Sequence, residues 1–117
     1  MITAVAAEQE TIVEQLRRFV AERDWEELHT PKNLTMALAV EAAELMEHFQ
    51  WLTAEESRAL SADRQAAVAE EIADVQIYLT MLADRLGIDL EQAVRAKIRK
   101  NAVKYPAETT EPPARRD

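Results

Sequence analysis

The sequence predicts an all-α protein. The chain has 117 residues, 48% of them hydrophobic, with one glycine and four prolines. Apolar residues recur at intervals of three and four along most of the chain, as on one face of a helix, and few stretches alternate apolar and polar residues as strands do. The length is that of one domain, and a domain of this size often gains stability by self-association.

Periodicity and capping residues delimit the first two predicted helices. The first spans about Glu8 to Arg23, and its apolar face consists of Ile12, Val13, Leu16, Phe19 and Val20. The second begins at Pro31, because Thr30 suits the N-cap position and proline suits the first helical position. We expect this second helix to continue to about Trp51.

A short helical turn and the longest helix follow. Thr53 and Glu56 have the spacing of a capping box, in which each side chain hydrogen-bonds the backbone of the other residue. Ser61 is the expected N-cap of the third long helix, and Gly87 suits its C-terminal stop. The apolar stripe of this helix consists of Val68, Ile72, Val75, Leu79, Leu82 and Leu86.

The last predicted helix follows Asp89, with Gln92 at the reciprocal position of a capping box, and it ends at Pro106. The residues after this proline lack periodicity and include two adjacent prolines, which is typical of a disordered tail. We therefore expect one all-α domain over residues 1–105 and a disordered tail over residues 106–117.

Composition argues against several classes of partner and site. The formal net charge is −8, whereas nucleic-acid polymers and anionic membranes are bound by basic surfaces. The chain has no cysteine, so neither a disulfide framework nor a thiolate metal site is available. The amino terminus lacks the pattern of a signal peptide, and no apolar run approaches the roughly 20 residues that span a bilayer. We expect a soluble, cytoplasmic protein.

Two pairs of acidic residues lie within apolar helical stretches: Glu41 with Glu44, and Glu71 with Asp74. A spacing of three places both carboxylates of a pair on one face of a helix. If the two helices pack together, the four carboxylates converge, and their mutual repulsion is severe unless a cation lies between them. The pattern therefore predicts a divalent-metal site.

Three observations favour this metal site over the alternative, a solvated acidic face. Every charged residue between Lys32 and Arg58 is acidic, whereas solvated helices usually alternate the two signs. Asp74 is the only acid within residues 72–83, an apolar stretch in which an unpaired carboxylate costs several kcal/mol. Glu41 stands where a leucine would complete the apolar stripe of its helix.

The ligand chemistry indicates the metal and the class of substrate. Carboxylates are hard oxygen donors that suit Mg²⁺, with Mn²⁺ as a substitute, better than Zn²⁺. Mg²⁺ held by carboxylates recruits substrate phosphates, so a phosphate ester or anhydride is the natural substrate. Lys97, Asn101 and Lys104 share one face of the last predicted helix, where they form either a polyphosphate-binding surface or a solvated basic one.

Three aromatic side chains and one imidazole are candidates for binding a nucleobase. Trp51 follows Glu44 by seven residues and Tyr78 follows Asp74 by four, which is helical spacing in both cases. Trp25 and His29 lie in the segment that precedes the second predicted helix. Each of these side chains alone also fits a core or surface role, but an aromatic edge beside each acidic pair suits base stacking. Together they predict a nucleotide substrate.

Several motifs of the chain occur together in one known family. They are Glu22-Arg-Asp-Trp25 with His29 and Lys32-Asn33, Glu41-x-x-Glu44 before Phe49-Gln50-Trp51, Glu70-Glu71-Ile-Ala-Asp74-Val with Ile77-Tyr78-Leu79, and Lys97, Asn101 and Tyr105-Pro106. On these motifs the sequence resembles the all-α nucleoside triphosphate pyrophosphohydrolases of the MazG-like superfamily, and within it the dCTP pyrophosphatase group. The resemblance extends from about residue 19 to residue 106.

This resemblance implies a four-helix MazG-like bundle completed by oligomerisation, as a homodimer or homotetramer. It implies Mg²⁺-dependent hydrolysis of a nucleoside triphosphate, with dCTP or a modified dCTP among the candidates, to the monophosphate and pyrophosphate, as in nucleotide pool sanitation. The catalytic and metal-binding residues would be Glu41, Glu44, Glu71 and Asp74. The substrate-binding residues would be Trp25, His29, Trp51 and Tyr78 at the base and sugar, and Lys97, Asn101 and Lys104 at the phosphates.

The sequence leaves the base preference and one competing function open. Leu16 stands where cytosine-selective members of the family place a histidine, and leucine cannot make that hydrogen bond. The competing function is a non-catalytic acidic helical module that dimerises or docks a basic partner without a metal. A ferritin-like di-iron site needs a Glu-x-x-His motif on each of two helices, and only Glu26 with His29 has that spacing.

Overall fold

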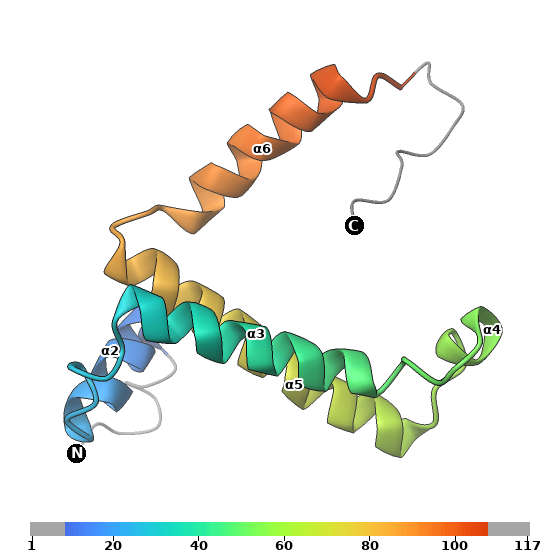
Figure 1. The fold of residues 1–117 in the computed structure, drawn as a ribbon. Coiled ribbons are helices and arrows are strands. Elements are labelled where there is room, and N and C mark those ends of the chain that lie inside the picture. The colour runs from blue at the N-terminus through green and yellow to red at the C-terminus, as the bar shows by residue number, and fades with distance from the viewer. Residues whose placement is uncertain (1–8, 108–117) are drawn as a thin grey trace. The chain divides into compact units, whose positions relative to one another are not determined.

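The computed structural model describes residues 9–107, and regular secondary structure in this range is helical throughout. The helices are α2 (Ile12–Glu22), α3 (Pro31–Glu47), α4 (Ala54–Ser57), α5 (Ala62–Arg85) and α6 (Leu90–Lys104) (Figure 1). This confirms the predicted all-α class. The chain divides into two compact units, Met1–Gly87 and Ile88–Asp117. None of the helices within residues 9–107 has the length and apolar character needed to span a bilayer.

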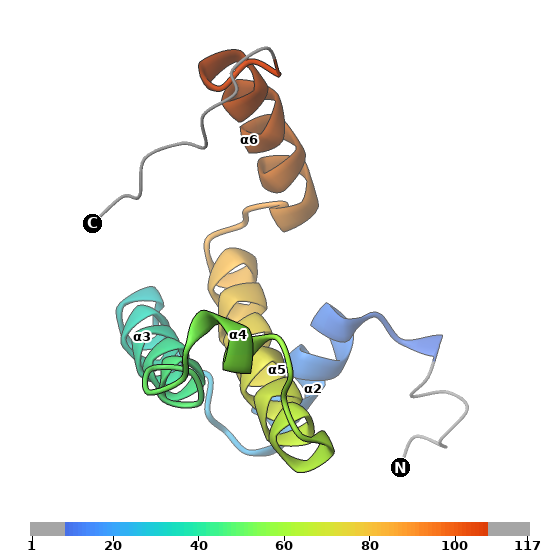
Figure 2. The same cartoon turned by 90° about the vertical axis from the view of Figure 1, so that its right-hand side faces the viewer.

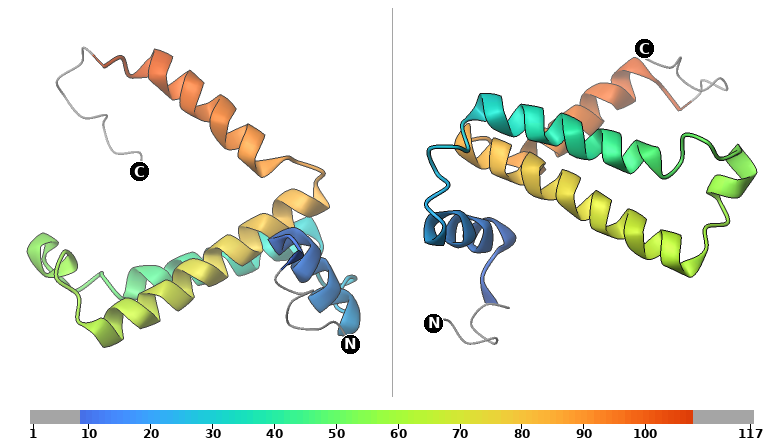
Figure 3. Two further views of the ribbon diagram at one scale, coloured as in Figure 1. Left: turned by 180° about the vertical axis from the view of Figure 1, so that it is seen from behind. Right: turned by 60° about the horizontal axis from the view of Figure 1, so that its bottom comes forward.

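The first unit is built around the antiparallel pair of α3 and α5. These helices run side by side, and α4 lies in the connection between them at one end (Figures 1 and 3). Helix α2 packs on the other side of α5 from α3 (Figure 2). The buried apolar residues of this unit are Val20, Leu34, Val68 and Ala83. Helix α5 is therefore the shared support for both of its neighbours.

A bidentate ion pair fastens α2 to the C-terminal end of α5. The Arg17 guanidinium donates through Nε to Asp84 Oδ2 at 2.9 Å and through Nη2 to Asp84 Oδ1. These hydrogen bonds lower the pKa of the Asp84 carboxyl below its ordinary value. Arg17 and Asp84 are 67 positions apart in the chain, so helical periodicity does not predict this tertiary contact.

Helix α2 begins later than the predicted start near Glu8, which lies outside the described residues. Its N-cap is Thr11, whose side-chain oxygen accepts a hydrogen bond from the backbone N–H of Glu14 at 3.1 Å. This cap begins the helix, because the N-cap residue itself has non-helical backbone angles. After Arg23, the C-cap, the chain leaves the helix through Asp24 in a left-handed conformation, with φ of 55°.

Helix α3 begins as predicted but does not continue to Trp51. Thr30 is the N-cap, with its side chain accepting from the Asn33 backbone N–H at 3.2 Å, and Pro31 opens the helix. At the other end, the N–H of His48 donates to the carbonyl of Leu45, three residues back. This tightening from the α-helical to the 3₁₀ spacing ends the helix at Glu47.

The capping residues of the later helices are confirmed. Thr53 and Glu56 form a complete capping box at α4, and Ser61 caps α5. Gly87, with φ of +66°, follows α5 in the left-handed conformation that glycine adopts without strain. The carboxylate of Asp89 accepts from the backbone N–H of the third residue beyond it, which begins α6.

The second unit contains α6, a helix with few buried side chains of its own. An ion pair from Arg95 to Glu91 at 2.9 Å supports it at i, i+4 spacing. Tyr105 is the C-cap, one residue before the proline that was expected to end the helix. From residue 108 on, the predicted tail lies outside the described residues.

Candidate metal centre and adjoining cavity

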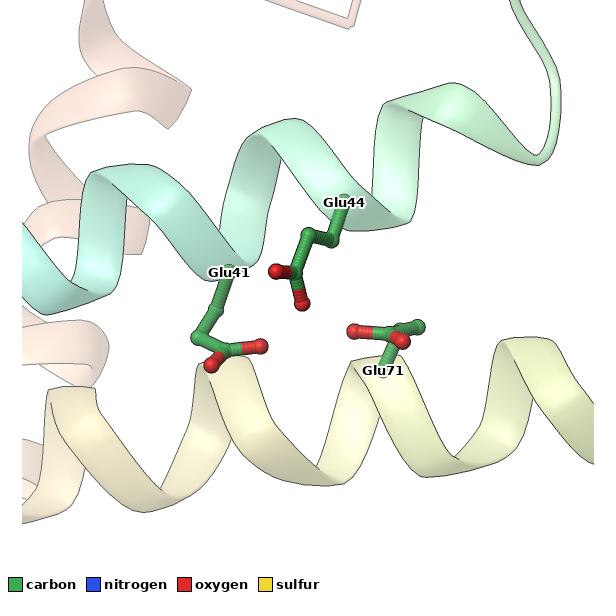
Figure 4. Close-up of side chains that lie close together, drawn as sticks. All are labelled: Glu41, Glu44 and Glu71. Carbon is green, nitrogen blue, oxygen red and sulfur yellow. The ribbon is translucent and has the colours of Figure 1, made fainter.

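Three carboxylates converge between α3 and α5. Glu41 and Glu44 extend from α3, and Glu71 extends toward them from α5 (Figure 4). One carboxylate oxygen from each residue lies within 4.8 Å of the others. All three side chains are half-buried. The structure therefore confirms that the two acidic motifs meet across the helix pair.

Local and tertiary structure each contribute to this cluster. Glu41 and Glu44 share a face because they are three residues apart on one helix. Glu71 reaches that face because α3 and α5 pack along most of their lengths. Apolar residues on both sides of the acidic positions hold the helices together, so the carboxylates remain close in spite of their repulsion.

The electrostatic consequence is clearest at Glu41. Burial, followed by hydrogen bonding and repulsion from Glu44, raises the pKa of Glu41 from 4.5 to about 7, and the charges of Asp74 and Glu71 add to the shift. Burial, together with the charges of Glu44 and Asp74, also raises the pKa of Glu71. Protonation at neutral pH is one way to relieve this repulsion, and a bound cation is the other.

The carboxylate oxygens fit a hard divalent cation. Oε2 of Glu41 and Oε2 of Glu71 are buried and have no hydrogen-bond partner. Buried polar atoms are normally paired, because an unpaired one loses its hydration without replacement. Two such oxygens within a group of three carboxylates match the donors that Mg²⁺ or Mn²⁺ prefers. This match depends only on the carboxylate oxygens, so it applies to any hard divalent cation.

Asp74, the fourth predicted carboxylate, lies beside this group of three. It is half-buried, as expected for an acid in an apolar stretch, and its charge contributes to the raised pKa values of Glu41 and Glu71. It also lines an adjoining cavity of about 540 Å³. Asp74 therefore connects the carboxylate cluster to this cavity.

The adjoining cavity, which we call the aromatic cavity, lies between α2, α5 and the segment that joins α2 to α3. Three of the predicted base-binding residues line it, Trp25, His29 and Tyr78. Its apolar wall is completed by Leu16, Phe19, Val20, Ile77 and Met81. A volume of this size lies within the range of small-molecule sites, and an apolar lining with a few polar groups is their usual character.

The rings that line the aromatic cavity from residues 19–29 contact one another. Trp25 packs edge to face on Phe19, with ring centroids 5.8 Å apart, and the His29 ring lies 6.1 Å from that of Trp25. The guanidinium of Arg23 lies 3.6 Å from the Phe19 ring centroid, in cation–π geometry. Nδ1 of His29 is buried without a hydrogen-bond partner, so a polar acceptor or donor remains available in the wall.

Trp51, a predicted substrate-binding residue, is not brought to the aromatic cavity. It is 86% exposed and lies beyond the end of α3, so the predicted continuation of that helix to residue 51 is wrong. Lys97, Asn101 and Lys104 are exposed on α6, which belongs to the second unit. Their roles in binding stay predictions.

Sequence reasoning missed His48 and the polar residues of the cavity rim. His48 is half-buried, and its charge opposes the rise in the pKa of Glu71. Its signal in the sequence was the i, i+4 spacing from Glu44. Gln15 and Arg18 line the aromatic cavity from α2, and Arg18 also pairs with Glu22. No such spacing distinguishes Gln15 and Arg18, since both lie on the charged face of α2.

The chain is similar to known proteins in both sequence and fold. The model of the MazG-like family matches residues 36–112. The dCTP pyrophosphatase 1 of Bos taurus is 47% identical to this chain over 103 residues, which are 83% of this chain and 61% of that protein. The dCTP pyrophosphatase 1 of Homo sapiens is 46% identical over 104 residues, which are 84% of this chain and 61% of that protein.

A solved structure resembles the chain over most of both lengths. It is the crystal structure of a pyrophosphatase from Archaeoglobus fulgidus, which aligns with a TM-score of 0.77 at 44% sequence identity. The alignment covers 81% of this chain and 89% of the archaeal one. The chain spans 61% of the length of the curated relatives that it matches.

Proposed function

The chain belongs to the MazG-like family, and from this membership we propose that it is a nucleoside triphosphate pyrophosphohydrolase. The observation that carries the proposal is the carboxylate cluster of Glu41, Glu44 and Glu71 next to a cavity lined by aromatic rings. The cluster suits a cation that binds phosphates, and the rings suit a base. Asp74 lines the cavity and its charge acts on Glu41 and Glu71, so one ligand can occupy the two parts at once.

The proposed metal ion is Mg²⁺, with Mn²⁺ as a substitute, held by Glu41, Glu44 and Glu71 and with Asp74 beside them. The two unpaired buried oxygens support this assignment. Bound there, Mg²⁺ neutralises negative charge on the phosphates and favours ionisation of the water nucleophile.

The proposed reaction is attack of water on the α-phosphorus. The bond from this phosphorus to the oxygen that bridges to the β-phosphorus breaks, so that the nucleoside monophosphate and pyrophosphate leave. A carboxylate of the cluster accepts the proton that the water loses. Trp25 and Tyr78 hold the base by stacking, and Asp74 lies where the sugar and the α-phosphate pass toward the cluster.

The proposed substrate is a deoxynucleoside triphosphate, with dCTP or a modified dCTP as the first candidates, in a nucleotide-pool role. The names of the mammalian relatives support this choice. The wall of the aromatic cavity at Leu16 is apolar, so the polar edge of the base must pair elsewhere. His29, which also lines the cavity and whose buried Nδ1 has no hydrogen-bond partner, is our candidate for this pairing.

We also propose that the protein works as a homodimer or homotetramer. Helix α3 is apolar on two sides, because the face away from α5 presents Met36, Ala39, Val40, Ala43 and Met46. We call this set the outer face of α3. Its large side chains are more than half exposed in the single chain, with Val40 and Met46 both at 57%. A helix that is apolar all round is normally buried, and a second copy is the proposed cover.

The competing proposal, a non-catalytic acidic module, fits the structure less well. A docking surface needs its charges on an open face, whereas Glu41 and Glu71 are half-buried and aim at each other. The two proposals differ in one measurable respect. The acidic module needs no metal, and the pyrophosphohydrolase requires one.

The test is pyrophosphate release from a panel of canonical and modified nucleoside triphosphates, with and without Mg²⁺. We expect release only with the metal, and a loss of about a hundredfold or more in Asp74→Asn and Glu71→Gln. Glu70→Gln is the matched control, because Glu70 neighbours Glu71 on α5 but is exposed. Folded wild-type protein that binds no Mg²⁺ and releases no pyrophosphate from any triphosphate would refute the proposal.

A further inference from the structure

The segment that joins α2 to α3, residues 24–30, carries two of the rings that line the aromatic cavity. It leaves α2 through the left-handed Asp24, and the N–H of Trp25 then donates to the carbonyl of Val20 at 3.1 Å. The N–H of His29 donates back to the carbonyls of Trp25 and Glu26, at 3.2 and 3.3 Å. These bonds shape the segment locally but do not attach it to α5, which forms the opposite wall.

Arg85, the last residue of α5, supplies that attachment. Its Nε donates to the carbonyl oxygen of His29 at 3.1 Å, and its Nη2 donates to the carbonyl oxygen of Glu26. A guanidinium is planar and offers these two donors in a fixed arrangement, so one side chain holds two carbonyls in a defined relative position. The two carbonyls belong to residues three positions apart in this segment, on either side of the exposed Leu28.

Arg85 does not itself line the aromatic cavity. Its side chain borders a second cavity of about 340 Å³, together with Arg17 and Asp84. His29 lines both cavities, as do Leu16, Val20 and Met81. The hydrogen bonds of Arg85 connect it to the aromatic cavity through the backbone of residues 26 and 29.

We propose that Arg85 is a positioning residue for the nucleotide-binding site. It holds the backbone of Glu26 and His29 against α5, so that Trp25 and His29 face Tyr78 across the aromatic cavity. This inference rests on the proposed function in one respect, namely that the cavity binds the nucleotide. Asn33 assists from α3, where its Nδ2 donates to the carbonyl of Leu28 at 2.9 Å.

If Arg85 contributed only its positive charge to the fold, lysine would replace it without loss. A cation in the last turn of a helix is favourable for its charge alone, and Arg85 also adds positive charge near Asp84. Lysine meets both of these requirements. It cannot place two donors on two separate carbonyls in the fixed plane of a guanidinium.

The experiment compares Arg85→Gln, Arg85→Lys and the control Arg58→Gln in steady-state hydrolysis of the best triphosphate. Arg58 is an exposed arginine at the C-cap of α4, and α4 lies at the opposite end of the α3–α5 pair from residues 24–30 (Figure 1). We expect Arg85→Gln to raise KM about tenfold with kcat within about twofold, because ordering the segment affects binding more than chemistry. Arg85→Lys should recover less than half of this loss on a logarithmic scale, and Arg58→Gln should leave KM unchanged. Unchanged KM in Arg85→Gln, or full recovery in Arg85→Lys, overturns the inference.

Amide hydrogen exchange of the ligand-free protein separates this inference from the proposed function. We expect the His29 amide to exchange faster in both Arg85 variants than in wild type, and at the wild-type rate in Arg58→Gln. If the wild-type protein hydrolyses no triphosphate, the proposed function fails while the exchange data still decide whether Arg85 holds the segment. Equal exchange of the His29 amide in Arg85→Lys and wild type overturns the inference about Arg85. If Arg85→Gln does not fold, Arg85→Lys provides the same comparison.

Discussion

At the scale of single residues, Glu41 bears the largest electrostatic conflict within residues 9–107. Its carboxyl lies between two helices, and the nearby charges of Glu44, Glu71 and Asp74 all disfavour its ionised form. Its Oε2 has no hydrogen-bond partner to offset the loss of hydration. A protein without a catalytic or binding need for this residue would gain stability from a leucine there, which is why the position indicates function.

The raised pKa of Glu41 predicts how the stability of the metal-free protein depends on pH. The pKa is about 7 in the folded protein and 4.5 ordinarily, so between these values the folded state holds a proton that the unfolded state releases. The free energy of unfolding should therefore fall through this group as the pH rises from about 4.5 to about 7. Glu71 acts in the same direction, since its pKa is also raised.

The measurement is urea denaturation of wild type and Glu41→Gln at several pH values from about 4.5 to about 8 in a chelator. The variant should lose less stability than wild type over this interval. Glu47→Gln, an exposed position on the same helix, should follow the wild-type curve. Parallel curves for wild type and Glu41→Gln would show that the conflict at this carboxyl is absent. The opposite trend of Asp84, whose pKa is lowered, is common to all three proteins and cancels in the comparison.

At the scale of elements, the helix termini are set by local hydrogen bonds. Thr11, Thr30, Thr53, Ser61 and Asp89 each accept, through the side chain, a hydrogen bond from the backbone N–H three residues on. Each cap satisfies an N–H that has no partner within its helix. Four of these five caps were predicted from the sequence, because the rule needs only residues that are close along the chain. Thr11 was missed because the first helix was predicted to begin at about Glu8, three residues before it.

The cap of α3 has a testable contribution to stability, because α3 is half of the central helix pair. Thr30→Ala should lower the free energy of unfolding by about 1 kcal/mol, the usual cost of losing an N-cap. Urea denaturation measures the change. Thr35→Ala is the matched control, since Thr35 is an exposed threonine within the same helix and alanine is the better helix former there. Equal effects of the two substitutions would contradict the assigned role of Thr30.

At the scale of the whole molecule, the single chain leaves much apolar surface uncovered. Only four hydrophobic residues within the described range are buried, whereas the outer face of α3 and several residues of the other helices are exposed. On α5, Ile72 is 54% exposed in spite of its place in the apolar stripe. Patches of this kind mark interaction sites in proteins that bury too little surface alone.

The proposed homo-oligomer predicts that a charge on the outer face of α3 dissociates the assembly. Val40→Glu should reduce the mass in solution, because the carboxylate would have to be buried without a partner in the interface. Size-exclusion chromatography with light scattering measures the mass over a range of protein concentrations. Gln65→Glu adds the same charge at an exposed polar position of α5 and should leave the mass unchanged. A wild-type protein that is monomeric throughout would contradict the proposal.

The sequence by itself determined the helical class, most helix termini and the two acidic pairs that supply the cluster. These features depend on residues within about four positions of one another, where helical spacing and capping chemistry act directly. The sequence could also place Glu41 with Glu44 on one face. It did not determine the end of α3, where Arg64 of α5 donates a hydrogen bond to the carbonyl of His48 at 3.3 Å.

Only the tertiary structure decided which distant groups meet. The packing of α3 on α5 brings Glu71 to Glu41 and Glu44, and the same packing leaves Asp74 beside the cluster, at the wall of the aromatic cavity. The contacts of Arg85 with the carbonyls of residues 26 and 29 join parts of the chain 59 and 56 positions apart. The physical reason is the range of the forces involved. Helix formation is a local equilibrium, whereas the register between two helices depends on apolar packing along their whole length.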